Sequence, residues 1–314
     1  MALPADVLVP DMEDSVPPSE KAVARSVIAD LLPRLAQSGC RVVVRVNGLE
    51  TGLLEEDLEA AVTPHVYGIN GGKVDGAWEV QEVDGILTGL EARRGLERGR
   101  IRLILWIESA LAVLNAHRIA SASRRVIAVA FGAEDFTADM GTQRTEGATE
   151  VYLPRAMVAM AARAARVVPL DIVYPSFRDE EGLRRDIQVG RSLGFRGKFA
   201  IHPSQIGPIN SMFSPLPEEV EHARRVVEAF EAAETQGKGA TSLDGRMIDV
   251  PIARRARDLL DMAEAIADQT YLPMAPGGNK VPWSQRLFSF TWKGAAESEN
   301  TFQVTKDIKR RAIS

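Results

Sequence analysis

Residues 103–108 read Leu103-Ile104-Leu105-Trp106-Ile107-Glu108, an unbroken apolar run that ends at a carboxylate. A continuous apolar run, rather than an alternating one, predicts a strand that is buried on both faces. Similar runs recur along the chain at residues 7–9, 42–46, 126–130, 172–174 and 199–201, with a weaker one at 68–74. Longer stretches with helical spacing separate them, and this repeated strand–helix alternation predicts an α/β fold with a parallel sheet.

The alternation favours a TIM-type (β/α)8 barrel over other parallel-sheet folds. The chain contains neither the G-x-G-x-x-G motif of dinucleotide-binding folds nor the G-x-x-x-x-G-K-[ST] motif of P-loop proteins. The sequence contains seven predicted strands, whereas a closed barrel of this type needs eight. Since an acidic cluster already follows the run Val7-Leu8-Val9, we expect the first strand to be missing. The strand near Val7 should then have an unpaired neighbouring position.

Composition divides the chain into three predicted parts. Residues 1–234 carry the strand–helix alternation and should form the catalytic barrel. Residues 235–268 begin with a segment rich in Gly, Ser and Asp and continue in a helical pattern, which predicts a flap followed by a helical arm. Residues 269–314 are punctuated by Pro and Gly, and we expect a loosely attached or disordered tail.

Charge and cysteine usage argue against several kinds of partner and location. The net charge is −5 at pH 7 and the sequence pI is about 5.6, so nothing favours nucleic acid as the main partner. No stretch of about 18 apolar residues is present, so we expect no membrane span. The single cysteine, Cys40, allows no disulfide within the chain, and the N-terminal residues do not resemble a signal peptide. We therefore expect a cytoplasmic protein.

Two acids follow neighbouring predicted strands. Glu108 comes after residues 103–107, and Asp135 comes shortly after residues 126–131. In such barrels the active site lies at the carboxyl ends of the strands, so the two side chains could converge on one Mg²⁺ ion. They could equally be helix N-caps or loop acids, and the spacing alone does not decide between these interpretations.

Basic residues and one histidine offer further candidates for substrate binding. Arg45 lies within an apolar strand and needs an anionic partner, either a substrate carboxylate or an internal acid such as Asp11, Glu13 or Asp14. Lys21 and Lys73 could meet phosphates or remain solvated. His202, before Pro203, could contact a ligand or form a hydrogen-bonded turn.

Six motifs stand out in the sequence: five lie at or just after the ends of predicted strands, and the sixth lies in the predicted flap. They read Asp11-Met12-Glu13-Asp14-Ser15-Val16, Val44-Arg45-Val46-Asn47, Ile107-Glu108-Ser109-Ala110, Phe131-Gly132-Ala133-Glu134-Asp135-Phe136, Ala200-Ile201-His202-Pro203-Ser204-Gln205-Ile206, and Gly237-Lys238-Gly239-Ala240 through Met247-Ile248-Asp249-Val250-Pro251. Together they resemble the HpcH/HpaI aldolase/citrate lyase β-subunit family, and in particular its citrate-lyase-β-like branch, which includes malyl-CoA and citramalyl-CoA lyases. The resemblance covers roughly residues 6 to 268.

The resemblance implies roles for residues at the barrel mouth. Glu108 and Asp135 match the ligands of Mg²⁺. Arg45 matches the arginine that holds the substrate carboxylate. Glu13 and Asp14 match acids close to the metal site.

The resemblance also implies the reaction and the partners. We expect Mg²⁺-dependent cleavage or formation of a carbon–carbon bond in a hydroxy-dicarboxylic acyl-CoA such as malyl-CoA or citramalyl-CoA. The partners would be a CoA thioester and a small 2-keto acid, either glyoxylate or pyruvate. Asp249 matches an acid on a flap that closes over a neighbouring subunit's site in related enzymes. We therefore expect a homo-oligomer, a trimer or hexamer, in which Asp249 transfers the proton at the acetyl α-carbon.

Two alternatives stay open from the sequence. The first is an aldolase that acts on hydroxy-keto acids without CoA, which the flap motif around Asp249 argues against. The second is a truncated, non-catalytic homologue that binds CoA, which the missing strand favours and the metal and flap motifs oppose.

Overall fold

The computed structural model describes residues 5–267 and 288–293, the latter as backbone only. These residues form two compact units. Residues 5–209 and 289–293 belong to the first unit, and residues 210–267 with 288 belong to the second.

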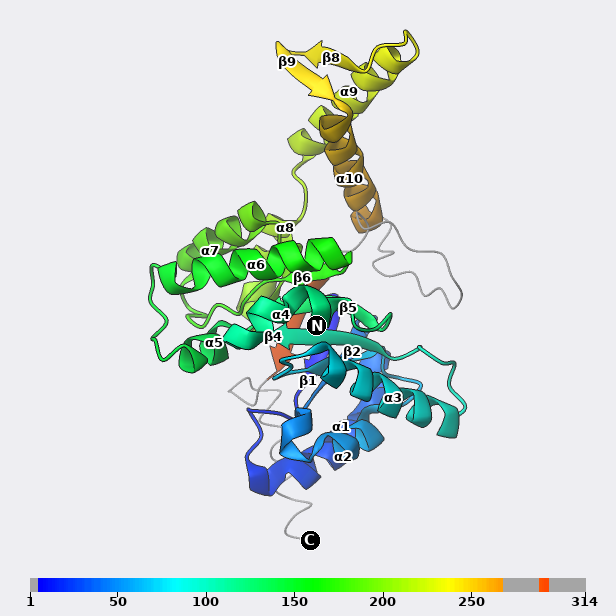
Figure 1. The fold of residues 1–314 in the computed structure, drawn as a ribbon, viewed down its shortest axis with the longest axis vertical. Helices are drawn as coiled ribbons and strands as arrows, with labels where there is room; N and C mark the ends of the chain where they lie inside the picture. The colour runs from blue at the N-terminus through cyan, green and yellow to red at the C-terminus, as the bar shows by residue number, and fades with distance from the viewer. Residues whose placement is uncertain (1–4, 268–287, 294–314) are drawn as a thin grey trace. The chain divides into compact units, whose positions relative to one another are not determined.

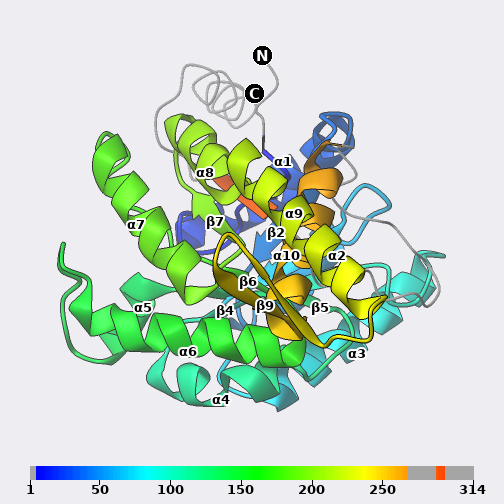
Figure 2. The ribbon, with the colours of Figure 1, turned by 90° about the horizontal axis from the view of Figure 1, so that it is seen from above.

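The first unit is built on parallel strands that follow one another around a barrel (Figures 1 and 2). Adjacent strands pair in chain order, and an isolated parallel bridge between Asp171 and Lys198 joins the sixth to the seventh. The strands are β1 (Val7–Pro10), β2 (Arg41–Val46), β3 (Gly68–Gly71), β4 (Arg102–Ile107), β5 (Val126–Phe131), β6 (Val168–Leu170) and β7 (Gly197–Ala200). This arrangement confirms the predicted α/β fold class of TIM-barrel type.

The eighth strand position is filled from the far end of the chain. Strand β10 (Phe288–Lys293) lies between β7 and β1 in the sheet order. It pairs with β1 in parallel, with Val7 opposite Phe290 and Pro10 opposite Lys293. The expectation of an unpaired position beside β1 is therefore wrong, because a segment of the predicted tail occupies it. Residues 269–287 and 294–314 of that tail lie outside the described residues.

Helices lie outside the strands of the first unit, as Figure 2 shows from above. They are α1 (Lys21–Ala36), α2 (Leu54–Ala61), α3 (Ala77–Arg93), α4 (Ala110–Ala120), α5 (Ala133–Asp139), α6 (Thr149–Ala165) and α7 (Glu180–Leu193), with short 3-10 turns at Pro18–Glu20, Leu49–Thr51 and Pro203–Gln205. Helix α8 (Ile206–Phe213) begins in the first unit and ends in the second. No helix in the described ranges is long and apolar enough to cross a bilayer.

Side-chain alternation along the strands divides the packing into an outer and an inner layer. Val44, Ile69 and Leu105 belong to the large apolar cluster that the strands share with the helices. Their neighbours along the strands lie on the opposite face, toward the barrel interior. Trp106 of β4 meets Phe199 of β7 there, with ring centroids 4.4 Å apart. Because β4 and β7 are not sheet neighbours, this contact crosses the interior.

The second unit contains the predicted flap and arm. Strands β8 (Ala240–Leu243) and β9 (Arg246–Asp249) form an antiparallel hairpin, which α10 (Val250–Ala267) follows. Helix α9 (Pro217–Glu234) packs against α10 through a small apolar core that includes Phe230 and Ile248. The predicted boundary at residue 234 assigned α9 to the barrel, whereas the structure groups it with the hairpin because its buried face packs there.

Removing β10 should destabilise the barrel. A chain ending at residue 287 would leave the facing edges of β1 and β7 without a partner strand, and unpaired edges promote aggregation. We expect its thermal midpoint to fall by about 5 °C or more relative to a chain ending at residue 293, with more high-mass species in light scattering. Equal midpoints for the two truncations would contradict the assignment of β10 to the barrel.

Candidate active site

The acidic loop after β1 is held by the guanidinium of Arg45. Arg45 Nε and Nη2 donate to Asp11 Oδ1 at 2.7 Å and Oδ2 at 2.9 Å, and Nη1 lies 2.9 Å from Glu13 Oε2. Burial acts to raise the pKa of Asp11, but the hydrogen bonds and charge of Arg45 outweigh it and leave that pKa below its usual value. The internal ion pair, one of the two alternatives for Arg45, is therefore present.

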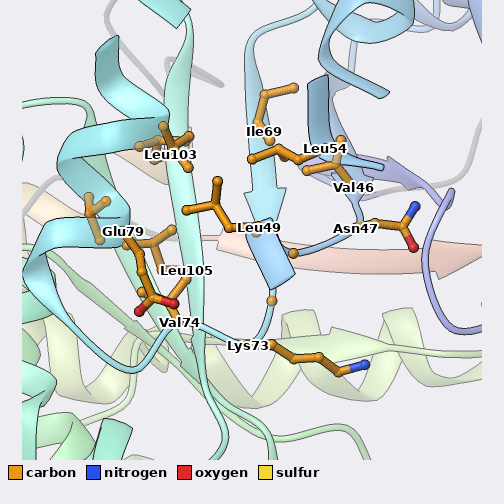
Figure 3. Close-up of a pocket in the computed structure, with 15 residues that line it drawn as sticks. Val46, Asn47, Leu49, Leu54, Ile69, Lys73, Val74, Glu79, Leu103 and Leu105 are labelled. Carbon is orange, nitrogen blue, oxygen red and sulfur yellow. The ribbon is translucent and has the colours of Figure 1, made fainter. Parts of the chain in front are cut away.

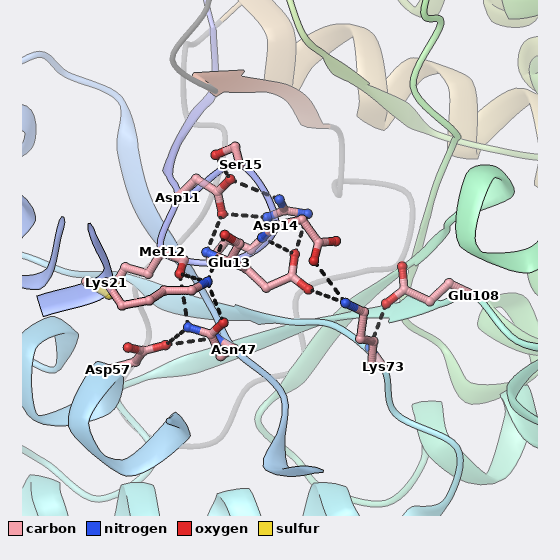
Figure 4. Close-up of polar contacts among 11 residues, drawn as sticks. Asp11, Met12, Glu13, Asp14, Ser15, Lys21, Asn47, Asp57, Lys73 and Glu108 are labelled. Carbon is pink, nitrogen blue, oxygen red and sulfur yellow. Dashed lines mark hydrogen bonds and ion pairs between the residues drawn. The ribbon is translucent and has the colours of Figure 1, made fainter. Parts of the chain in front are cut away.

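Lys73 connects this loop to Glu108, as Figure 4 shows. Its ammonium lies 2.9 Å from both Glu13 Oε1 and Asp14 Oδ1, and its backbone N–H donates to Glu108 Oε1 at 2.6 Å. Lys73 has a φ of 54°, a left-handed conformation that is costly for a residue with a Cβ. This conformation directs the side chain toward the acidic loop while the N–H faces Glu108.

Glu108 occupies a narrow space between two glycines. A Cβ added at Gly132 would lie 2.6 Å from Glu108 Oε2, and one at Gly72 would lie 3.0 Å from Oε1. Burial, together with the negative charge of Asp135, raises the pKa of Glu108 to about 8. Burial and the charge of Asp14 likewise raise the pKa of Asp135. The structure thus brings the two predicted acids together with an excess of negative charge.

Such a carboxylate pair fits a hard cation. Glu108 accepts the uncharged backbone N–H of Lys73, and among the described residues no group of three or more acidic, His or Cys side chains could hold a metal ion together. A bound Mg²⁺ would therefore rely on two carboxylates, with water and substrate oxygens completing its coordination, which is the usual pattern for Mg²⁺. The absence of a Cβ at Gly72 and Gly132 makes room for the Glu108 carboxylate itself.

Lys21 does not face a ligand site. It begins α1, is 9% exposed, and its ammonium donates to Met12 O at 2.8 Å, Glu13 O at 3.0 Å and Asn47 Oδ1 at 2.7 Å. These acceptors use its three protons, so Lys21 is neither solvated nor free to bind a phosphate, the two roles considered from the sequence, and it has a structural role instead. Lys21 thus holds the backbone of the loop after β1 in place through the carbonyls of Met12 and Glu13.

Asn47 and Asp57, for which the sequence predicted no role, hold the same loop in place through further hydrogen bonds. Asp57 Oδ2 accepts from the backbone N–H of Asn47 at 2.9 Å and from its Nδ2 at 2.6 Å. Both residues are buried. The available signal was Asn47 at the end of a strand, but Asp57 lies on α2 and only the fold brings it there.

His202 forms a hydrogen-bonded turn, one of its two expected roles. The backbone N–H of Ser204 donates to its Nδ1 at 3.2 Å, and the ring stacks on Phe177 with centroids 4.8 Å apart. Asp249 lies in the second unit at the end of β9, where its Oδ1 accepts the backbone N–H of Ile252 at 3.1 Å. Asp249 therefore caps α10, and its catalytic role stays a prediction.

A small apolar slot lies near Lys73 (Figure 3). Its volume is about 20 Å³, and Leu49, Leu54, Ile69 and Leu105 contribute to its lining. Such a volume holds about one water molecule or methyl group. In Figure 3 the ammonium of Lys73 points away from these apolar side chains, so the slot is a packing defect of the outer layer.

The comparisons with known proteins agree with this geometry. A model of the HpcH/HpaI aldolase/citrate lyase family matches residues 1–203. The chain belongs to the HpcH/HpaI aldolase/citrate lyase family. The citrate lyase subunit beta of Leuconostoc mesenteroides subsp. cremoris is 37% identical to this family member over 261 residues, covering 83% of this chain and 86% of that protein. The L-malyl-CoA/beta-methylmalyl-CoA lyase of Cereibacter sphaeroides is 34% identical over 284 residues, covering 84% and 89%.

A solved structure supports the same family placement. The protein CitE from Mycobacterium tuberculosis, in complex with magnesium, acetoacetate and coenzyme A, is 28% identical to this family member with a TM-score of 0.66. The match covers 82% of this chain and 90% of that chain. The resemblance inferred from the motifs is thus confirmed, and the chain is an enzyme of the citrate-lyase-β-like lyase type.

The acid pair should make the stability of the metal-free protein depend on pH. The pKa of Glu108 is about 8 in the folded state, against 4.5 for a free glutamate. The folded state therefore holds a proton that the unfolded state releases, and the free energy of unfolding falls as pH rises from about 4.5 to 8. We expect a loss of roughly 2–4 kcal/mol in chelator-treated protein, allowing for partial solvent contact.

Glu108→Gln should remove most of this loss, because the amide does not titrate. Urea unfolding at pH 5 and pH 8.5 measures it. Glu134→Gln, which changes an exposed acid beside Asp135, is the matched control and should keep the wild-type dependence. The same pH dependence in Glu108→Gln and wild type would refute the raised pKa.

Proposed function

We propose that this chain is a Mg²⁺-dependent lyase that cleaves or forms a carbon–carbon bond in a hydroxy-dicarboxylic acyl-CoA. Malyl-CoA and citramalyl-CoA are the candidate thioesters, giving acetyl-CoA with glyoxylate or pyruvate. The observation that carries the proposal is the uncompensated pair of Glu108 and Asp135 at the barrel mouth, beside the ion pairs of Arg45 and Lys73. We place the reaction in the cytoplasm, in keeping with a chain whose single cysteine is a free thiol.

In this proposal Glu108 and Asp135 hold the metal and Arg45 helps to bind the keto-acid carboxylate. When bound, Mg²⁺ would supply Lewis-acid polarisation of the oxygen that becomes the keto group. Arg45 would share its outer N–H groups between the substrate and the acids Asp11 and Glu13. Lys73 would keep Glu108 in position through its backbone N–H while its ammonium offsets the charge of the acidic loop.

The protons lost and gained in the reaction define the proposed role of Asp249. In cleavage the substrate hydroxyl gives its proton to solvent water, the carbon–carbon bond breaks as the hydroxyl oxygen becomes the keto oxygen, and the electron pair of that bond is left on the α-carbon of the acetyl thioester. A proton must then be delivered to that carbon, and we assign this step to Asp249. The hairpin that carries Asp249 would also exclude water from the reacting carbon.

A lyase assay tests the proposal. Purified protein should release glyoxylate from malyl-CoA or pyruvate from citramalyl-CoA with Mg²⁺, and no keto acid with a chelator. Glu108→Gln should lower kcat/KM at least about 100-fold, because it removes a charged ligand of the metal, while Glu134→Gln stays near wild type. Cleavage of hydroxy-keto acids without CoA would instead show a CoA-independent aldolase. Binding of CoA without turnover of any of these compounds would show a non-catalytic homologue.

Mixed oligomers test the role of Asp249 and the proposed homo-oligomer, a trimer or hexamer. Asp249→Ala and Glu108→Ala should each be inactive alone. If the flap acts on a neighbouring subunit, random mixing in equal amounts restores about a quarter of the sites. Activity after subunit exchange measures this, and each variant carried alone through the same exchange is the control. Full activity of Asp249→Ala would remove the catalytic role, and no recovery on mixing would place the flap in its own subunit.

A further inference from the structure

Two buried polar side chains inside the barrel have no hydrogen-bond partner in the part of the chain that the structure describes. Asn70 on β3 is 0% exposed, and neither its Nδ2 nor its Oδ1 forms a hydrogen bond. Trp106 on β4 is 8% exposed, and its Nε1 forms none either. Nearly all buried polar atoms in native proteins are paired with protein or water, so these three atoms point to a missing binding partner.

Strand register places both side chains on the inner face beneath the acids. Asn70 is level with Arg45 on β2 and with Ile104 on β4. Trp106 lies two residues beyond Ile104, and Glu108 follows two residues later, so the inner face of β4 rises from the level of Asn70 through Trp106 toward Glu108. Ile69 and Leu105, the strand neighbours of Asn70 and Trp106, belong to the outer cluster. This alternation directs Asn70 and Trp106 inward.

The neighbours of Trp106 leave its N–H unmatched. On the adjacent strand β5, Ala128 is level with Ile104 and Ala130 with Trp106, so this part of the inner wall carries only methyl groups. Phe199 covers the indole with its ring and offers no acceptor. An indole N–H can only donate, whereas the Asn70 amide can donate and accept. The interior therefore holds two donor groups near Arg45, on β3 and β4, for which the described residues provide no acceptor.

We infer that Asn70 and Trp106 form the floor of the acyl pocket and donate hydrogen bonds to the carboxylate of the 2-keto-acid portion of the substrate. The inference rests on the proposed function, whose metal-binding acids lie directly above. Arg45 is already engaged by Asp11 and Glu13, so it cannot satisfy a second carboxylate alone. A carboxylate withdrawn from water needs several donors, and Asn70 and Trp106 provide them at the level of Arg45 and just above it.

Conservative substitutions of Asn70 and Trp106 test whether these residues bind the keto acid or only stabilise the fold. Trp106→Phe removes the N–H and keeps an aromatic ring against Phe199, and Asn70→Leu keeps the volume and removes both polar atoms. Trp78→Phe is the matched control, because Trp78 is 63% exposed on α3. Isothermal titration with pyruvate and with glyoxylate in the presence of Mg²⁺ measures binding, and the lyase assay measures KM and kcat separately.

We expect each floor variant to weaken keto-acid binding about tenfold, the effect of one hydrogen bond to a charged group, and Trp78→Phe to leave it unchanged. In the lyase assay the floor variants should raise KM for the acyl-CoA. Asn70→Leu should also raise the thermal midpoint of the ligand-free protein, because an unpaired buried amide is destabilising. A residue with a merely structural role would lower stability when changed.

The possible outcomes show separately whether the binding role of Asn70 and Trp106 or the proposed lyase activity is wrong. If the wild-type protein is a lyase and its Trp106→Phe and Asn70→Leu variants bind keto acid normally, the proposed role of these two residues is wrong and the proposed function stands. If the wild-type protein binds pyruvate or glyoxylate through Asn70 and Trp106 but cleaves neither thioester, the binding role of the two residues stands and the proposed lyase activity is wrong. Wild-type protein that binds neither keto acid would overturn both.

Discussion

The guanidinium of Arg45 lies on the inner face of β2, where a positive charge is stable only beside negative charge. Asp11 and Glu13 supply that charge, and they do so from the loop that follows the neighbouring strand. Glu13 is shared with Lys73, and the backbone of Lys73 reaches Glu108. Groups of alternating charge therefore follow one another at the mouth of the barrel, and each one contacts the next. They are Asp11, Arg45, Glu13, Lys73 and Glu108. Glu108 is the last of these groups, where the neutral N–H of Lys73 is its contact and the charge of Asp135 opposes it.

In a second ionic cluster every positive charge is balanced by a negative one. Arg155, Asp171, Asp186 and Lys198 are joined by contacts of 2.5–3.2 Å, with two positive charges against two negative ones. Asp171 and Lys198 also make the bridge between β6 and β7. Every charge there has a partner, so the cluster serves the structure of the barrel. The acids at the mouth are carboxylates too, but burial and the negative charge around Glu108 and Asp135 raise the pKa of both, and this unbalanced charge favours a cation there.

Much of the fold and part of the site could be predicted from sequence. Parallel strands end at one edge of a barrel, so Glu108 and Asp135, which follow adjacent strands, had to lie near one another. The role of Lys21 could not be predicted, because two of its three acceptors are backbone carbonyls that only the folded loop presents. Asn70 stands in a weak, short apolar run, and nothing in the sequence shows that its amide lacks a partner. Helix α9 has a strongly periodic pattern, but periodicity does not say which unit its buried face contacts.

Strand β10 was the least predictable element, and its position has a consequence for how the protein folds. The pairing of Val7 with Phe290 joins residues near opposite ends of the chain. Closing so long a loop is entropically unfavourable, and contacts of large sequence separation slow the folding of a domain. During synthesis the ribosome releases β1 through β7 long before β10 emerges. Until residues 288–293 have been synthesised, β1 through β7 can form only an open sheet, in which the edges of β1 and β7 that face β10 have no partner strand.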